Sequence, residues 1–125
     1  LLNKEKNDLE VALYELEKLA GMLGNNKELL QKMVQSFLKH TPPLLDELFT
    51  AAAEGNRDQV SKICHRLKAS YKTMSITSLA EPIHLLEIEN DKLSISEQTT
   101  YLEEIKEVSS KVFKSLKSEV FHYME

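Results

Sequence analysis

Apolar residues recur every three or four positions along most of the chain, in stretches separated by short polar breaks. This spacing places them on one face of an α-helix, because a helical turn takes about 3.6 residues. The pattern predicts five helical stretches and no strand. In the first stretch the apolar face consists of Leu9, Leu13, Leu16, Ala20 and Leu23.

The first two helices are separated by Gly24-Asn25-Asn26, and Asn26 is a suitable N-cap for the second. The second stretch is interrupted at Thr41-Pro42-Pro43. Proline cannot donate to the helical ladder, but a threonine cap followed by a proline can start a new helix. We therefore expect one long helix kinked near residues 39–42, or two helices in near-continuation. The apolar face of this stretch is Leu30, Val34, Phe37, Leu38, Leu45, Leu48 and Ala52.

The remaining breaks also carry helix-capping residues. Gly55-Asn56 ends the second stretch and caps the third. The fourth helix is predicted to begin near Thr77 or Ser78, with Glu81 completing a capping box and Pro82 tolerated near the first turn.

The fifth helix is predicted to open at Ser94-x-x-Glu97, another capping box. Short connections between long amphipathic helices favour antiparallel neighbours. The predicted fold is therefore all-α, an antiparallel up-and-down four-helix bundle with an additional N-terminal helix. Residues 1–7 are polar and charged and are predicted to form a lead-in or linker, and residues 8–125 the bundle.

Composition narrows the class of protein. The 125 residues are enough for one domain with a proper core, and a net charge of −4 argues against nucleic-acid binding. The single cysteine, Cys64, excludes an internal disulfide and fits a reducing compartment. No apolar run approaches the ~20 residues that span a membrane. A cytoplasmic domain without direct membrane contact is predicted.

Positive charge gathers around one histidine of the third helix, His65. The apolar stripe of this helix centres on Leu67, and a rotation of ~100° per residue puts His65 roughly 160° away from it. The ring is therefore predicted to face solvent, with the small Ala69 as its next-turn neighbour. The stripe comprises Val60, Ile63, Cys64, Leu67, Tyr71 and Met74, and the cations are Lys62, Arg66, Lys68 and Lys72.

An exposed neutral imidazole is a good nucleophile at physiological pH. The sequence shows no orienting acid and no oxyanion hole, which a catalytic triad would need. It also has no glycine-rich loop that could bind the phosphates of a nucleotide. Accepting a phosphoryl group requires less of the protein than triad catalysis does. The protein must hold the transferred group in line with the attacking nitrogen and balance the negative charge of its oxygens. Lys68, one turn along, is suitably placed to meet phosphoryl oxygens.

The stretch His65-Arg66-Leu67-Lys68-Ala69-Ser70, followed by Met74-Ser75, Leu79 and Leu86-Glu87, resembles the pattern of histidine phosphotransfer (HPt) domains. The resemblance covers roughly residues 9–120. It implies a four-helix bundle whose surface histidine accepts a phosphoryl group from a receiver-domain aspartate and passes it to another response regulator. It also implies excision from a hybrid histidine kinase, which can itself be membrane-bound.

The resemblance assigns a role to individual positions. It makes His65 the phosphoacceptor and Lys68 the residue that stabilises the phosphoryl group. Ser70 matches the serine of the family, and Glu87 falls where the family places a polar residue facing the histidine. Among the nearby residues, Lys72 supplies a longer-range field. The sequence departs from the family at Ala69 and Ser75, where the family has glycine.

The resemblance implies a phosphotransfer carrier without kinase activity and without a cofactor of its own, since the receiver would supply Mg²⁺. The expected partners are receiver domains and a hybrid kinase, with the isolated domain monomeric. Two alternatives stay open. The chain could be an HPt-like module that binds a receiver or kinase without carrying phosphate, or an unrelated helical scaffold on which His65 is an ordinary surface residue.

Overall fold

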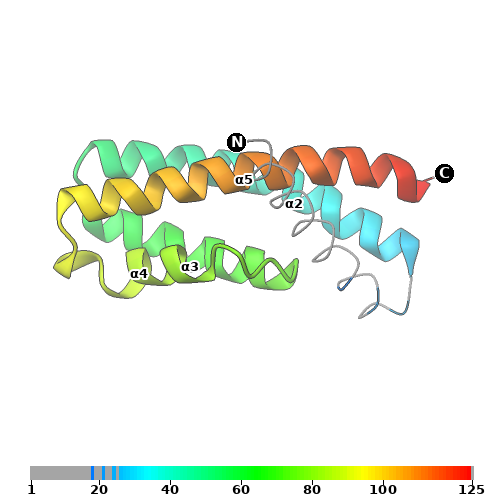
Figure 1. Ribbon diagram of the computed structural model, residues 1–125, viewed down its shortest axis with the longest axis horizontal. Coiled ribbons are helices and arrows are strands. Elements are labelled where there is room, and N and C mark those ends of the chain that lie inside the picture. The colour runs from blue at the N-terminus through cyan, green and yellow to red at the C-terminus, as the bar shows by residue number, and fades with distance from the viewer. Residues whose placement is uncertain (1–17, 19–20, 22–23, 25, 125) are drawn as a thin grey trace, which may run out of the picture.

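A computed structural model describes residues 18, 21, 24 and 26–124 of the chain. Their long elements are four helices, and the predicted all-α class is confirmed for this part of the chain (Figure 1). The predicted lead-in lies outside the described residues, as does most of the predicted first helix. The elements are α2 (Lys27–Ala53), α3 (Arg57–Thr73), α4 (Ala80–Ile88), the 3-10 turn η1 (Asn90–Lys92) and α5 (Ile95–Met124).

The helices lie along a common long axis, and successive helices run in opposite directions (Figure 1). Both α2 and α4 contact α3 and α5. Each described helix therefore has two helical neighbours, and its apolar face is covered from two sides. This packing brings α4 against α3, the helix that carries His65.

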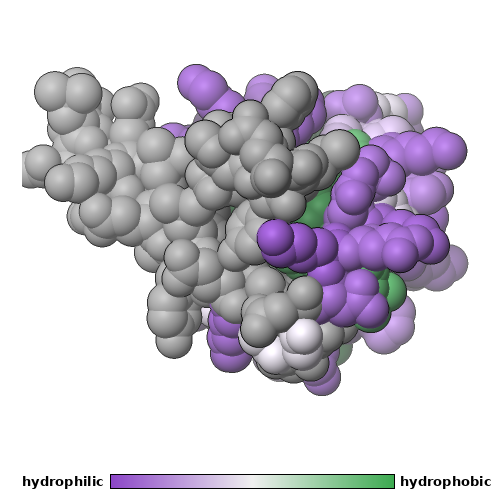
Figure 2. Space-filling view, turned by 90° about the vertical axis from the view of Figure 1, so that its right-hand side faces the viewer, coloured by the Kyte–Doolittle hydropathy of each residue, from purple (hydrophilic) through white to green (hydrophobic). Residues whose placement is uncertain are grey.

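The core includes most of the apolar faces predicted for the second and third helices, although Leu38 and Ala52 are only partly buried. Leu48, Leu67, Leu86 and Ile105 are fully buried within it. The coloured part of the surface in Figure 2 is mostly hydrophilic, with small apolar patches between polar side chains. Amphipathic helices produce an apolar core and a hydrophilic surface because only one face of each helix is removed from water. The other buried apolar residues are Leu30, Val34, Phe37, Leu44, Leu45, Ala51, Val60, Ile63, Cys64, Tyr71, Met74, Ile76, Leu79, Ile83, Val112 and Leu116.

Three of the predicted helix starts are confirmed by their hydrogen bonds. The side chains of Asn26 and Asn56 each accept a bond of 3.1 Å from the backbone N–H three residues further on. At the start of α5, the Ser94 hydroxyl accepts from the Glu97 N–H at 3.1 Å, while the Glu97 carboxylate accepts from the Ser94 N–H at 3.0 Å. These bonds satisfy donors that the helix itself leaves without partners.

Of the two alternatives, one long helix is confirmed and a new helix capped by Thr41 is wrong, because α2 runs through Pro42 and Pro43 as one helix. The two prolines deprive the carbonyls of Leu38 and Lys39 of their usual i+4 partners. Thr41 is only 2% exposed and belongs to the buried face. Packing on both sides of the prolines outweighs the local loss of hydrogen bonds.

The start of α4 lies close to the predicted one near Thr77 or Ser78. Helix α4 begins at Ala80, and its N-cap, Leu79, makes no side-chain capping bond. Leu79 is fully buried, so the need to place this side chain in the core determines where the helix starts. Pro82 lies in the first turn as predicted, where its missing N–H costs no helical bond.

Helix α3 ends in a residue with left-handed backbone. Ser75 has φ 58°, a conformation that usually selects glycine. Its N–H donates to Lys72 O at 2.9 Å, and the N–H of Ile76 donates to Tyr71 O at 2.9 Å, which together form a Schellman motif. Serine therefore occupies a turn that glycine would adopt with less strain.

Candidate functional site

His65 lies in the middle of α3 with its side chain 76% exposed, while Leu67 two residues later is fully buried. The predicted exposure of the ring is confirmed. Ala69, one turn further along, is exposed as well. The ring therefore projects from a helix face where the next turn offers only a methyl group.

Glu87, near the end of α4, lies against the imidazole. Its Oε1 is 3.0 Å from Nδ1 of His65, and its side chain is only 8% exposed. An ionised carboxylate can only accept a hydrogen bond, so Nδ1 carries the proton and donates it. In the neutral ring the lone pair then resides on Nε2. The contact selects one tautomer and leaves the other ring nitrogen available for chemistry.

Lys68 is the second cation beside Glu87. Its Nζ lies 3.7 Å from Oε2, an atom that accepts no hydrogen bond from the described residues. The pKa of Glu87 lies below its usual range, first because His65 donates to it and then because Lys68 is near. Burial opposes this shift but does not cancel it. Glu87 thus stays ionised while it contacts both residues.

The other cations predicted around His65 are largely neutralised or remote. Lys62 pairs with Asp58 on its own helix at 3.0 Å, and Arg66 approaches Glu47 of α2 at 4.0 Å. Lys72 is exposed and, among the described residues, makes no ion pair. The positive charge next to the ring therefore comes from Lys68.

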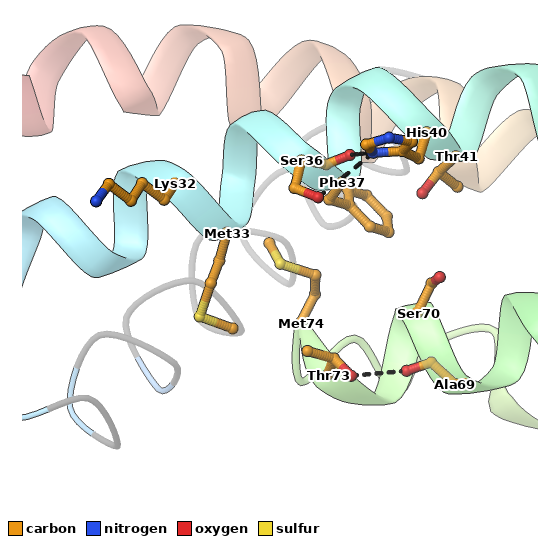
Figure 3. A pocket seen from close by; sticks show the side chains of 10 residues that line it. All are labelled: Lys32, Met33, Ser36, Phe37, His40, Thr41, Ala69, Ser70, Thr73 and Met74. Atoms are coloured by element: carbon orange, nitrogen blue, oxygen red, sulfur yellow. Dashed lines mark hydrogen bonds between the residues drawn. The ribbon is translucent and has the colours of Figure 1, made fainter.

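Ser70 does not lie beside the ring. It is half-buried and lines a groove of about 460 Å³ between α2 and α3 (Figure 3). Ala69 borders the same groove, and the ring of Phe37 forms part of its wall. The groove begins one turn beyond His65 and is also lined by Lys32, Met33, Ser36, His40, Thr41, Thr73 and Met74.

A second exposed histidine, His40, belongs to this groove. Its Nδ1 lies 2.9 Å from the backbone carbonyl of Ser36 and can donate to it (Figure 3). A carbonyl of the same helix orients this ring, and no carboxylate in the described part of the chain pairs with it. His40 therefore offers a natural comparison for His65.

Sequence reasoning missed Ser61, whose hydroxyl donates to the backbone carbonyl of Glu87 at 2.5 Å. Ser61 precedes His65 by four residues, so the two share one face of α3. That spacing was visible in the sequence, but the register of α4 against α3 was not.

Cys64 behaves as a buried apolar residue. It is fully enclosed, and burial raises the pKa of its thiol to about 12, with a smaller contribution from Glu87. A thiol with such a pKa is unreactive at neutral pH.

The described residues contain no cluster of three His, Cys, Asp or Glu side chains that could hold a metal ion. None of the described helices has a stretch both long and apolar enough to span a bilayer.

No family model, curated protein or solved structure matches this chain. Functional assignment therefore depends on the geometry around His65.

Proposed function

We propose that the chain is an HPt module that accepts a phosphoryl group on Nε2 of His65 and passes it to a response-regulator aspartate. The contact between His65 Nδ1 and Glu87 Oε1 carries this proposal, together with the exposure of the ring. A histidine held by a buried carboxylate and otherwise open to solvent has one oriented, unprotonated nitrogen that a large partner can reach. The proposed architecture is an antiparallel four-helix bundle.

The phosphoryl transfer can be written with all bonds and charges accounted for, and it needs no cofactor on this chain. The Nε2 lone pair attacks the phosphorus of an aspartyl phosphate on the receiver, an N–P bond forms, and the bond from phosphorus to the aspartyl oxygen breaks. The aspartate leaves as a carboxylate, and the phosphorylated ring keeps its Nδ1 proton. Glu87 then faces a positively charged imidazolium, whose charge it stabilises. The Mg²⁺ would belong to the receiver.

Lys68 is proposed to bind the transferred group. Its side chain is 46% exposed and meets Glu87 at 3.7 Å, beyond hydrogen-bonding distance. Because the ammonium itself is half-exposed, it can turn from Glu87 toward phosphoryl oxygens. Glu87 keeps it close to the ring until the phosphoryl group arrives.

The groove between α2 and α3 is the proposed docking surface for the receiver. Its apolar wall includes Met33, Phe37 and Met74, and polar or charged residues such as Lys32 and His40 complete its lining. A transient interface usually has such an apolar centre and polar edge. The partner would then cover Ala69 and bring its aspartate to the ring from that side.

The test is incubation with a phosphorylated receiver domain, followed by detection of acid-labile, base-stable phosphate. His65→Gln should abolish acceptance, while the domain should stay folded because the glutamine amide can still donate to Glu87. His84→Gln, at an exposed histidine of α4 outside the groove, is the control and should still accept phosphate. Phosphate on His65→Gln at the wild-type level would overturn the proposal. Receiver binding without phosphate on the wild-type protein would instead favour a pure interaction module, an outcome that Ala69 in place of glycine keeps open.

A further inference from the structure

We propose that Ser61 is a positioning residue for the His65–Glu87 pair, because its hydroxyl holds the last turn of α4 against α3. The effect of Ser61 on the orientation of the His65 ring does not depend on whether the ring accepts a phosphoryl group. Its effect on phosphoryl transfer rests on the function proposed above.

The last turn of a helix leaves carbonyl groups without helical partners. Helix α4 ends at Ile88, and the carbonyl of Leu85 is taken by the N–H of Glu89 at 2.9 Å. The carbonyl of Glu87 instead accepts from the Ser61 hydroxyl of α3 at 2.5 Å. A side chain of the neighbouring helix therefore replaces the missing helical donor.

Glu87 is consequently attached to α3 at two points. Its backbone is bound to Ser61 and its carboxylate to His65, four residues later on the same face. Four helical residues rise about 6 Å, a distance that the backbone and side chain of one glutamate can span. Two attachments on successive turns restrict both sliding and rotation of α4, and they fix where the carboxylate meets the ring.

A separate set of bonds keeps the segment after α4 in place. The Asn90 side chain donates to the carbonyl of Arg57 at 2.8 Å, and the Arg57 guanidinium donates to the carbonyl of Leu93 at 3.1 Å and to that of Asn90. These bonds lie one turn before Ser61 on α3. Loss of the Ser61 hydroxyl should therefore loosen the last turn of α4 without detaching it, and the domain should stay folded.

The experiment measures the ring and the carboxylate directly by NMR in the full chain. Imidazole ¹⁵N shifts report the tautomer of His65, and a ¹³C carboxyl titration reports the pKa of Glu87. Ser61→Ala should lower the share of the Nδ1–H tautomer and raise the Glu87 pKa toward its ordinary value of 4.5. Ser61→Thr, which keeps the hydroxyl, should restore both.

The matched control is Ser110→Ala. Ser110 also donates to a backbone carbonyl, that of Lys106 at 2.8 Å, but on the exposed side of α5. This variant should leave both NMR readouts unchanged. The proposal is overturned if Ser61→Ala keeps the wild-type tautomer and Glu87 pKa, even with a lowered melting temperature, because Ser61 would then be only structural. It is also overturned if Ser61→Thr behaves like Ser61→Ala.

Transfer assays with a receiver separate this inference from the proposed function. If wild type accepts phosphate, Ser61→Ala should transfer severalfold more slowly and Ser61→Thr at nearly the wild-type rate. If the wild-type chain accepts none, the proposed function fails, while the NMR readouts still decide whether Ser61 positions the pair.

Discussion

Glu87 and His65 are 22 positions apart in the sequence, yet the carboxylate of one determines which nitrogen of the other carries a proton. The contact spans two helices and depends on the packing of α4 against α3. Its strength depends on the ionisation of Glu87, which makes it sensitive to pH.

The folded state should lose stability in acid through Glu87. Because the folded pKa of Glu87 is depressed, the stability it contributes is fully present above its ordinary value of 4.5. That contribution is lost as the pH falls through the lower folded value. Glu87→Gln should therefore be less stable than wild type near neutral pH, and the difference should shrink below pH 4.5.

Urea unfolding at a series of pH values measures the free energy of unfolding of both proteins, with Glu81→Gln on the exposed side of α4 as the control. Parallel pH profiles for wild type and Glu87→Gln would contradict the prediction.

Replacing Lys68 by alanine should slow phosphoryl transfer but preserve receiver binding. The free energy of unfolding should fall by no more than about 1 kcal/mol, because the Lys68 ammonium is half-exposed and His65 still donates to Glu87. Rapid-quench transfer rates and receiver titrations separate the two effects. Lys72→Ala, on the same helix, should leave the transfer rate and receiver binding unchanged. Equal transfer rates for Lys68→Ala and Lys72→Ala would show that Lys68 has no part in the transfer.

Enlarging Ala69 should block the docking groove. Leucine or arginine at this position would fill the edge of the groove nearest His65 and prevent close approach, which transfer between two side chains requires. Ala69→Gly should transfer at least as fast as wild type, although helix propensity costs about 1 kcal/mol. Transfer rates for the three variants provide the measurement, and Ala80→Leu controls for added bulk on another exposed helix position. Normal transfer by both bulky variants would mean that the receiver docks elsewhere.

Ser75→Gly should stabilise the domain. Left-handed backbone costs a non-glycine residue roughly 1 kcal/mol, and glycine relieves this cost while adding some entropy to the unfolded chain. We expect a net gain of about 0.5 kcal/mol in the free energy of unfolding, measured by chemical denaturation. Ser75→Ala retains the strain and should show no gain. A destabilised glycine variant would show that the serine side chain contributes more than its backbone costs.

Local chemistry was sufficient to predict the parts of the fold that depend on neighbouring residues. The caps at Asn26, Asn56 and Ser94 follow from side chains that reach their own backbone. The exposure of His65 follows from helical periodicity alone. These features need no knowledge of any other helix.

The errors and omissions share a different cause. Thr41 remains helical because the buried face continues on both sides of the prolines. The bond from Ser61 to Glu87 requires the register of two helices that pack against each other. Such features arise from tertiary packing, which outweighs the local preferences of single residues.

The two prolines of α2 remove hydrogen bonds from the middle of the helix. Helices bend most easily where hydrogen bonds of the ladder are missing, and here two successive bonds are absent. The α2 residues that line the groove lie between Lys32 and Thr41, before the prolines, whereas Glu47, beyond them, approaches Arg66 beside His65. Bending at the prolines can therefore widen or narrow the groove while the acceptor histidine stays where it is. If the proposed function holds, bending of this one helix would let the groove fit receivers of different shape while Nε2 of His65 keeps its position.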